Sequence, residues 1–287
     1  MKNMKNTLDP QYKALLQKIV DTGDDKGDRT GIGTRTIFGT QMRINLSEGF
    51  PILTSRHHSF KIAFHETMMF LNGETDSIKW LESNNIKIWH GNTTREFLDD
   101  RGLYDLPVGD IGKCYGYQWR HFGGPGGVDQ LRAAFETLKT NPNDRRMIVT
   151  AWNPNQIKDA PLPSCHIYYQ FFVVNNRLSC QFYMRSLDVY HGCGYDIMCY
   201  GLIVNLFAKA LNMEVGDLIM STGDTHIYNN QFDVVKQQIL QPHFDLPTIE
   251  IKSKLKTLDD ICSLKWGDVN LIGYKSAGKL DKVDMAV

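Results

Sequence analysis

One cysteine on a proline-delimited turn is the strongest candidate for chemistry in this sequence. It stands in Leu162-Pro163-Ser164-Cys165-His166, and Arg185-Ser186 follows it. Arginines near a cysteine can bind a phosphate and lower the thiol pKa below its usual ~8.5, which raises the fraction of reactive thiolate. Four arginines stand in polar stretches: Arg29, Arg145, Arg146 and Arg185. These residues predict a nucleophilic thiol beside a small anionic ligand.

Two common cysteine chemistries fit this pattern poorly. A cysteine protease would need a base such as His166, but consecutive residues of a strand point to opposite faces, which weakens a Cys165–His166 dyad. A protein-tyrosine phosphatase would need a Cys-x5-Arg phosphate loop, and none begins at Cys165. Covalent attack on an electrophilic ring carbon of a phosphorylated ligand remains.

A glutamate inside an apolar stretch is the candidate proton handler. Residues 59–71 predict a helix, and Glu66 stands among Phe64, Met68 and Met69. Burial there would raise its pKa toward neutrality, where a carboxyl can both accept and release protons. The alternative is a helix glutamate whose side chain reaches solvent.

Other polar residues stand where a pocket could use them. Asp196 lies near the start of an apolar helix expected over 195–211, where the helix dipole favours a carboxylate and a first-turn role is the structural alternative. His226 and Tyr228 are two residues apart on an extended stretch and point the same way. Arg145 and Arg146 precede a strand and suggest phosphate recognition.

The elements that must position these residues alternate between helical and strand patterns. Helices are expected over 9–23, 59–71, 92–99, 128–138, 195–211 and 229–240, and strands over 36–38, 86–89, 147–152, 166–174, 178–183, 217–221 and 248–251. Residues 112–119 are expected in a turn and strand, and 185–194 in a loop. The Gly-rich loop 24–34 carries Arg29 and lacks a Walker GK[ST] sequence. We predict a single α+β domain over residues 1–287.

Composition narrows the class of protein. Lys+Arg and Asp+Glu number 32 each, so no global positive field favours non-specific nucleic-acid binding. The six cysteines form no CxxC pair and no zinc spacing, which favours a reduced chain without a metal. No apolar run reaches the roughly 18 residues of a membrane span, and the N-terminus lacks a signal-like apolar region. We expect a cytoplasmic enzyme with no membrane partner and no obligatory nucleic acid.

The motifs resemble those of the thymidylate synthase family, in the same order and over nearly the whole chain. They are RTGIGT, the HE of the helix with Glu66, YGYQWRHFG, NPNDRRMIV, LPSCH, LSCQFYMRSLDV, GDTHIYNN and the final MAV. The resemblance implies a twisted mixed β-sheet packed with helices and a homodimer formed sheet on sheet. It also implies one-carbon transfer from 5,10-methylenetetrahydrofolate to C5 of a pyrimidine nucleoside monophosphate.

The same resemblance implies a role for each matching residue. The catalytic residues would be Cys165, attacking C6 of the base, with Glu66, Tyr115, Asp196 and His166 around it. The phosphate would be held by Arg29, Arg185 and Ser186, with Arg145 and Arg146 from the other subunit. The sugar would be held by His226 and Tyr228. The folate site would be lined by Trp89, Asn92, Asp188, Gly192 and Val287.

One departure bears on the substrate. The family carries asparagine at the position of Asp196, and that side chain contacts the base. Uracil offers an N3–H donor and an O4 acceptor, which suit an amide, whereas the N4 amino group of cytosine suits a carboxylate. The departure resembles the deoxycytidylate (dCMP) hydroxymethylase branch and predicts a cytosine nucleotide, dCMP or CMP, over dUMP.

Three further substitutions flank the expected base and folate pockets: Met184, His90 and the pair Cys193-Gly194. The product depends on whether water or hydride reaches the one-carbon unit, and we favour 5-hydroxymethyl-dCMP over 5-methyl-dCMP. The alternatives are thymidylate synthesis from dUMP and, in another class, a non-catalytic nucleotide- or RNA-binding relative. Retention of Cys165, Glu66 and the arginines argues against the last.

Overall fold

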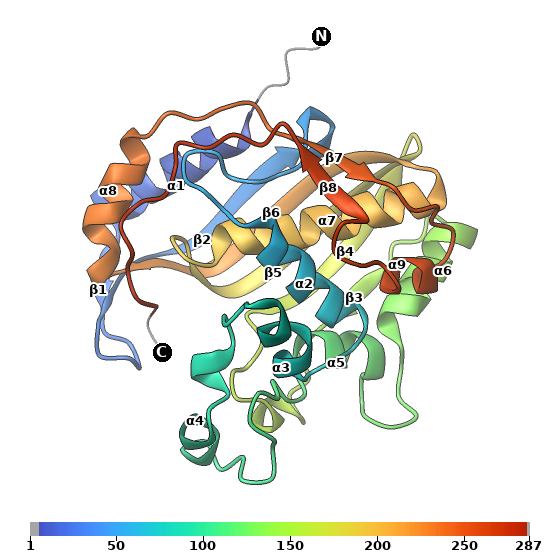
Figure 1. Ribbon diagram of the computed structural model, residues 1–287, viewed down its shortest axis with the longest axis horizontal. Helices are drawn as coiled ribbons and strands as arrows, with labels where there is room; N and C mark the ends of the chain where they lie inside the picture. Colours follow the sequence, from blue (N-terminus) through green and yellow to red (C-terminus); the bar gives the residue numbers. More distant parts are fainter. Residues whose placement is uncertain (1–5, 286–287) are drawn as a thin grey trace.

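A computed structural model describes residues 6–285 and centres on one mixed β-sheet (Figure 1). The strands lie in the order β1-β2-β6-β5-β4-β3, and only the β5–β6 pair is parallel. Their bounds are β1 Asp24–Lys26, β2 Thr34–Asn45, β3 Ile148–Thr150, β4 His166–Val174, β5 Arg177–Asp188 and β6 Glu214–Tyr228. A small second sheet pairs β7 (Thr248–Ile251) with β8 (Val269–Ile272).

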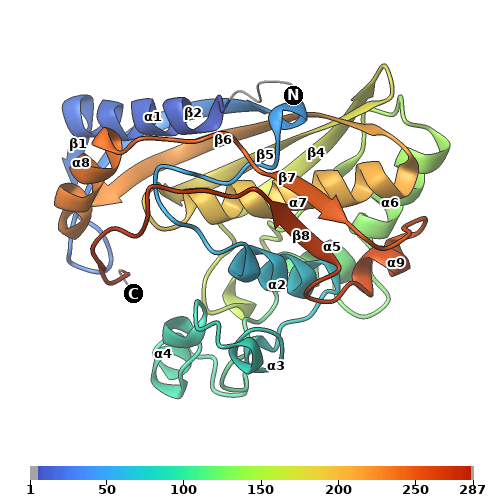
Figure 2. The same cartoon turned by 45° about the horizontal axis from the view of Figure 1, so that its top comes forward.

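Helices cover one face of the main sheet. Their bounds are α1 Leu8–Thr22, α2 Phe60–Leu71, α3 Ser77–Trp80, α4 Arg95–Asp99, α5 Tyr115–His121, α6 Gln130–Thr140, α7 Cys193–Leu211, α8 Phe232–Leu240 and α9 Leu258–Cys262. The central helix α7 packs on β5 and β6, α2 packs on α7, and α1 packs on β2 and α8 (Figure 2). None of the helices within residues 6–285 is long and apolar enough to span a membrane.

The two faces of the sheet differ in burial. Along β5, Leu178, Cys180 and Phe182 are buried, whereas the residues between them are partly or fully exposed. Successive strand residues point to opposite faces, so one face meets the helices and the other is open in the single chain. Phe172 of β4 is 60% exposed on that second face, where its neighbour in the pairing is Ser179.

Most of the predicted elements are present, and the mixed α+β class is confirmed. The predicted hairpin between β4 and β5 turns at Asn175 and Asn176, which both adopt positive φ. The helices expected over 59–71 and 195–211 appear as α2 and α7. The strand predicted over 217–221 is longer in the structure, because β6 continues to Tyr228.

Three local predictions are wrong. Ile86 to Trp89 form no strand, because the chain turns at Asn85 with a φ of 61° and the apolar side chains Ile86 and Trp89 pack into the core instead. Residues 112–119 do not form a strand, since Tyr115–His121 is helical. A Cβ at Gly116 would lie 2.5 Å from the Phe70 carbonyl oxygen, so glycine allows α5 to pack against α2.

The third error concerns residues 185–188, predicted to be loop. They belong to β5, whose pairing with β6 continues through Ser186 opposite Asp224 and Asp188 opposite His226. Polar residues at this end made the segment look like a loop. The parallel partner β6 nevertheless satisfies the backbone, so the sheet itself carries Arg185 and Ser186 into the site.

Candidate active site

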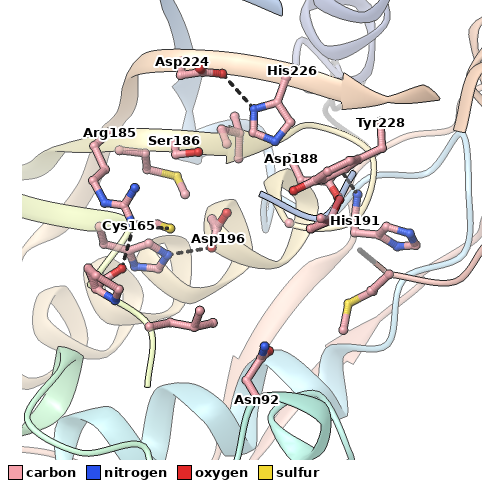
Figure 3. Close-up of a pocket in the computed structure, with 18 of the residues that line it drawn as sticks. Asn92, Cys165, Arg185, Ser186, Asp188, His191, Asp196, Asp224, His226 and Tyr228 are labelled. Carbon is pink, nitrogen blue, oxygen red and sulfur yellow. Dashed lines mark hydrogen bonds and ion pairs between the residues drawn. The ribbon is translucent and has the colours of Figure 1, made fainter. Parts of the chain in front are cut away.

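A single cavity of about 940 Å³ gathers most of the predicted site residues (Figure 3). It is lined by Arg29, Glu66, Trp89, Asn92, Tyr115, Cys165, His166, Arg185, Ser186, Asp188, Gly192, Asp196, His226 and Tyr228. These residues come from β4, β5, β6, α2, α5 and α7 and from loops such as the one between β1 and β2. The cavity volume falls within the range of small-molecule sites.

Cys165 lies immediately before β4 and is held from two sides. Its backbone N–H donates to the Tyr115 hydroxyl at 3.0 Å, and the Arg185 guanidinium lies 3.6 Å from its sulfur. Arg185 also donates to the carbonyl oxygens of Pro163 at 2.7 Å and Ser164 at 3.0 Å. These bonds fix the guanidinium beside the thiol, where it favours the thiolate.

The expected lowering of the thiol pKa is wrong for the free site. Burial raises the pKa of Cys165, and Arg185 lowers it only in part. Desolvation disfavours the charged form of a thiol, and one nearby guanidinium does not outweigh it here. Of the four predicted arginines, only Arg185 affects the pKa of this thiol.

Glu66 lies on α2 and behaves as the sequence predicts. Burial raises its pKa to about 7, while a hydrogen bond from the Trp89 indole N–H at 2.9 Å lowers it and the Asp196 charge raises it further. A carboxyl with this pKa is partly protonated at neutral pH. Glu66 can therefore both donate and accept a proton inside the cavity.

Tyr115 opens α5 in a strained backbone conformation. Its φ is 35°, a value that non-glycine residues seldom adopt. The ring stacks on Phe70 with centroids 4.9 Å apart, and burial raises the pKa of the phenol well above its usual range. The hydroxyl therefore stays protonated and remains available as a proton donor beside Cys165.

Asp196 and His166 form a short polar contact within the cavity. His166 Nε2 lies 2.7 Å from Asp196 Oδ1, and the Tyr200 hydroxyl lies 3.2 Å from His166 Nδ1. A hydroxyl that donates to Nδ1 leaves Nε2 as the N–H donor to the carboxylate. Both residues line the cavity, but the two ring nitrogens of His166 have Asp196 and Tyr200 as partners, which agrees with the expectation that Cys165 and His166 form a poor dyad.

The end of β6 presents two rings to the cavity, as the sequence predicts. His226 Nδ1 lies 2.9 Å from Asp224 Oδ1, and Asp224 also accepts from Lys26 and Thr36. Asp224 thereby orients the imidazole and leaves its other nitrogen for a ligand. Tyr228 lies two residues on, with its ring centroid 5.2 Å from that of His226.

The predicted folate residues lie on another side of the cavity. Both oxygens of Asp188 are engaged: Oδ1 accepts from the backbone N–H groups of Tyr190 and His191, and Oδ2 accepts from Gln231 Nε2 at 2.9 Å. A Cβ at Gly192 would lie 3.2 Å from the Asp188 carbonyl oxygen. This wall is therefore fitted closely around a glycine.

Three predicted residues lie outside the cavity or outside the described chain. Arg145 and Arg146 are exposed and do not line it, and the Arg146 side chain is 92% exposed. Val287 lies outside the described residues.

Sequence reasoning missed several titratable residues of the wall, among them Arg101 and His191. His191 stands between the predicted residues Asp188 and Gly192, so their spacing could have revealed it. Arg101 follows two aspartates in a polar turn and gave no signal. Within residues 6–285, no group of three or more His, Cys, Asp or Glu side chains is arranged to hold a metal.

Comparison with known proteins agrees with the resemblance. A family model described as thymidylate synthase matches residues 10–287. The chain is 40% identical over 287 residues to a bifunctional dihydrofolate reductase-thymidylate synthase of Paramecium tetraurelia, covering 96% of this chain and 61% of that relative. The chain thus spans less than two thirds of the length of this relative. It belongs to the thymidylate synthase family, whose members are one-carbon transferases that use methylenetetrahydrofolate as co-substrate.

Proposed function

We propose that this protein transfers one carbon from methylenetetrahydrofolate to C5 of a cytosine nucleotide, dCMP or CMP. The carboxylate of Asp196 in the base-contacting position is the observation that carries the proposal. His166 donates to Oδ1 of this carboxylate at 2.7 Å, which leaves Oδ2 as an acceptor. An acceptor suits the N4 amino group of cytosine and repels O4 of uracil.

The second hydrogen bond to the base concerns N3. Unprotonated cytosine offers an acceptor at N3, so the pair with Asp196 is completed when one proton is shared between N3 and the carboxyl group. Glu66 lies close enough to Asp196 for their charges to interact. A site built for particular hydrogen bonds rejects the wrong partner by roughly 10⁴-fold, because buried polar groups are left unpaired.

The proposed reaction begins at Cys165. Its thiolate attacks C6 of the base, forming the S–C6 bond and moving the electron pair of the C5–C6 double bond toward C5. Arg185 stabilises the thiolate, and a bound nucleotide phosphate would be held by Arg185 and Ser186 with Arg29. The nucleophilic C5 then accepts the one-carbon unit. The bond between the transferred carbon and the folate nitrogen would break as the C5 proton passes to a base, so that tetrahydrofolate leaves and an exocyclic methylene remains. Water would add to this methylene, and elimination of the Cys165 thiolate from C6 would restore the aromatic base.

Glu66 and Tyr115 are proposed to move the protons. Glu66 has a pKa of about 7 and the Tyr115 phenol stays protonated, so the two groups supply both directions of transfer at neutral pH. The Tyr115 hydroxyl accepts a hydrogen bond from the Cys165 backbone N–H, which supports a position near the reacting carbons. Because the phenol stays protonated, the C5 proton would pass to Glu66 or to a water.

The residues present fit a folate. Trp89 offers a flat indole, Asn92 an amide, and Asp188 a carboxylate beside the close-fitting Gly192. Methylenetetrahydrofolate would supply the one-carbon unit from this side of the cavity. Trp89 is only 8% exposed, and its indole N–H donates to Glu66.

The proposed product is the 5-hydroxymethyl nucleotide. Hydroxymethylation needs a water and a proton acceptor, and Glu66 is a partly ionised carboxyl inside the cavity. Hydride transfer would instead give a 5-methyl nucleotide.

A second candidate is thymidylate synthesis from dUMP. The name of the Paramecium relative favours it, since that protein is described as a thymidylate synthase. In this case Asp196 would have to be protonated to donate to O4 of uracil.

A homodimer joined through the open face of the sheet is part of the proposal. This face carries Phe172 and the stacked rings of Tyr168 and Tyr183, whose centroids lie 6.0 Å apart. The Arg145 carbonyl accepts from Gln170, a β4 residue two positions from Phe172. Arg145 and Arg146 thus lie at the rim of this face, from which they would reach the phosphate in the partner.

Mass analysis of the product tests the proposal. The purified protein is incubated with methylenetetrahydrofolate and either dCMP or dUMP, and the nucleotide mass is measured. We expect an added hydroxymethyl group on dCMP. Methylation of dUMP with no change in dCMP would instead support the second candidate.

A further inference from the structure

Arg101 is a cavity residue that the proposed reaction does not use. It lies in the turn after α4, and its guanidinium lies 3.6 Å from the centroid of the Phe97 ring. This stacking holds the side chain in place without consuming its hydrogen-bond donors. The five N–H groups of the guanidinium therefore remain available.

Arg101 has no carboxylate partner and no side-chain hydrogen bond within residues 6–285. Its neighbour on α4 differs: Arg95 pairs with Asp99 at 2.7 Å and donates to the carbonyl oxygens of Leu103 and Leu106. Arg95 stabilises the turn, whereas Arg101 has no such structural task. A cation left unpaired in a cavity wall is suited to a ligand of opposite charge.

A second unpaired arginine lies close by. Arg29 lines the same cavity from the loop between β1 and β2, and its side chain has no bond to the described part of the chain. The acid next to it, Asp28, is engaged with Thr30 and the Gly33 backbone. Burial and the positive charge of Arg29 both lower the pKa of Arg101, so the two guanidiniums interact unfavourably.

The charge of Asp100 offsets part of this lowering of the Arg101 pKa. Neither guanidinium is hydrogen-bonded to a carboxylate within residues 6–285, and an anion between the two would relieve their repulsion. We propose that Arg101 and Arg29 form an anion subsite in the wall of the cavity that holds a phosphate or carboxylate of a bound substrate. Arg101 is thus a positioning residue for the substrates.

The anion subsite rests on the proposed function in one respect: the anion is taken to belong to the nucleotide or to the folate. The two sources are the nucleotide 5′-phosphate and the glutamate carboxylates of the folate. Arg101 follows α4, whose preceding turn carries the predicted folate residue Asn92, while Arg29 is a predicted phosphate residue. Either source would bring the loop of Arg29 toward α4.

The test compares Arg101→Gln with wild type, because glutamine keeps a planar polar group and removes the charge. Calorimetry measures the Kd of dCMP, dUMP, deoxycytidine and inorganic phosphate, and kinetics measure the KM of methylenetetrahydrofolate with one and with three glutamates. Lys139→Ala is the control, because it removes one positive charge from an exposed position on α6. Melting temperature checks folding, and Arg101→Lys serves if the glutamine variant is unstable.

A loss of one charge-assisted contact weakens binding by about tenfold or more. If the anion is the phosphate, Arg101→Gln raises the Kd of dCMP and dUMP equally and leaves deoxycytidine unchanged. If it is the glutamate, the KM of the folate rises and more so for the triglutamate. Arg101→Lys is expected to retain part of the affinity. Folded variants with unchanged constants for both substrates would overturn the subsite, whatever base preference the enzyme shows.

Discussion

The two walls of the cavity are built differently. On the strand wall, Arg185, Ser186, His226 and Tyr228 stand on β5 and β6, whose backbone pairing sets their positions. Arg185 and His226 are further fixed by hydrogen bonds to the protein. On the loop wall, Arg29, Asn92 and Arg101 come from turns and short helices, and their side chains have no bonds to the described chain. A bound nucleotide would therefore meet a strand wall whose charged groups are already held in place, and a loop wall whose side chains are not held by hydrogen bonds.

This difference predicts different losses of activity when residues of the two walls are substituted. A preformed charged group contributes its full interaction, because no ordering is needed on binding. A loop residue contributes less, since part of its interaction is offset by the ordering of the loop. Substitutions on the strand wall should therefore cost more activity than substitutions on the loop wall.

The largest effect is expected at Cys165, next to the strand wall. Cys165→Ala removes the nucleophile, so kcat should fall by about 10⁴-fold or more while nucleotide binding persists. Single-turnover kinetics and calorimetry with dCMP measure the two quantities. Turnover close to that of wild type would contradict covalent catalysis by this thiol.

Arg185→Ala should have the next largest effect. It removes the cation 3.6 Å from the thiol and a proposed phosphate ligand, so kcat/KM should fall by about 100- to 1000-fold. Reaction of Cys165 with a thiol reagent across a pH series provides a second measurement. The thiol pKa should rise further in the variant, and an unchanged pKa would refute the stabilising role.

Arg29→Ala tests the loop wall and should cost less. We expect a rise in the nucleotide KM of about tenfold with little change in kcat, because one charge-assisted contact is lost. Steady-state kinetics with dCMP measure it. A fall in kcat/KM as large as that of Arg185→Ala would contradict the proposed difference between the strand wall and the loop wall.

Glu66 should make the stability of the protein depend on pH. The folded protein holds the Glu66 proton up to about pH 7, whereas the unfolded chain releases it near 4.5. The free energy of unfolding therefore falls as pH rises through this window. Glu66→Gln should be more stable than wild type by about 3 kcal/mol at pH 8 and nearly equal to it near pH 4.5. Urea unfolding at both pH values measures this, and an equal difference at both would exclude the raised pKa.

The sequence predicts the strand wall better than its surroundings. The motif order identifies Cys165, Arg185 and His226 as site residues, and the cavity brings them together. The end of β5, which carries Arg185, was predicted to be a loop. Its parallel partner β6 begins 37 residues further along the chain (Arg177 to Glu214), and local composition does not indicate that pairing. Turn-rich segments such as 86–89 were mistaken for strand, since packing against the core outweighs β propensity there.

Electrostatics could be predicted only where one effect dominates. Glu66 is buried by its apolar neighbours, so the direction of its pKa shift follows from the sequence. At Cys165 burial and Arg185 oppose each other, and their balance depends on depth and distance that no spacing reveals. The sequence could not single out Arg101, because only the folded chain brings it into the same cavity as Arg29.

The base preference is the central claim, and one measurement tests it most directly. The ratio of kcat/KM for dCMP to that for dUMP is measured for wild type and for Asp196→Asn, which keeps a side chain of the same shape. We predict a ratio well above one in wild type that falls below one in the variant, because the amide can donate to O4 of uracil. A wild-type ratio below one, unchanged by the substitution, would contradict the account.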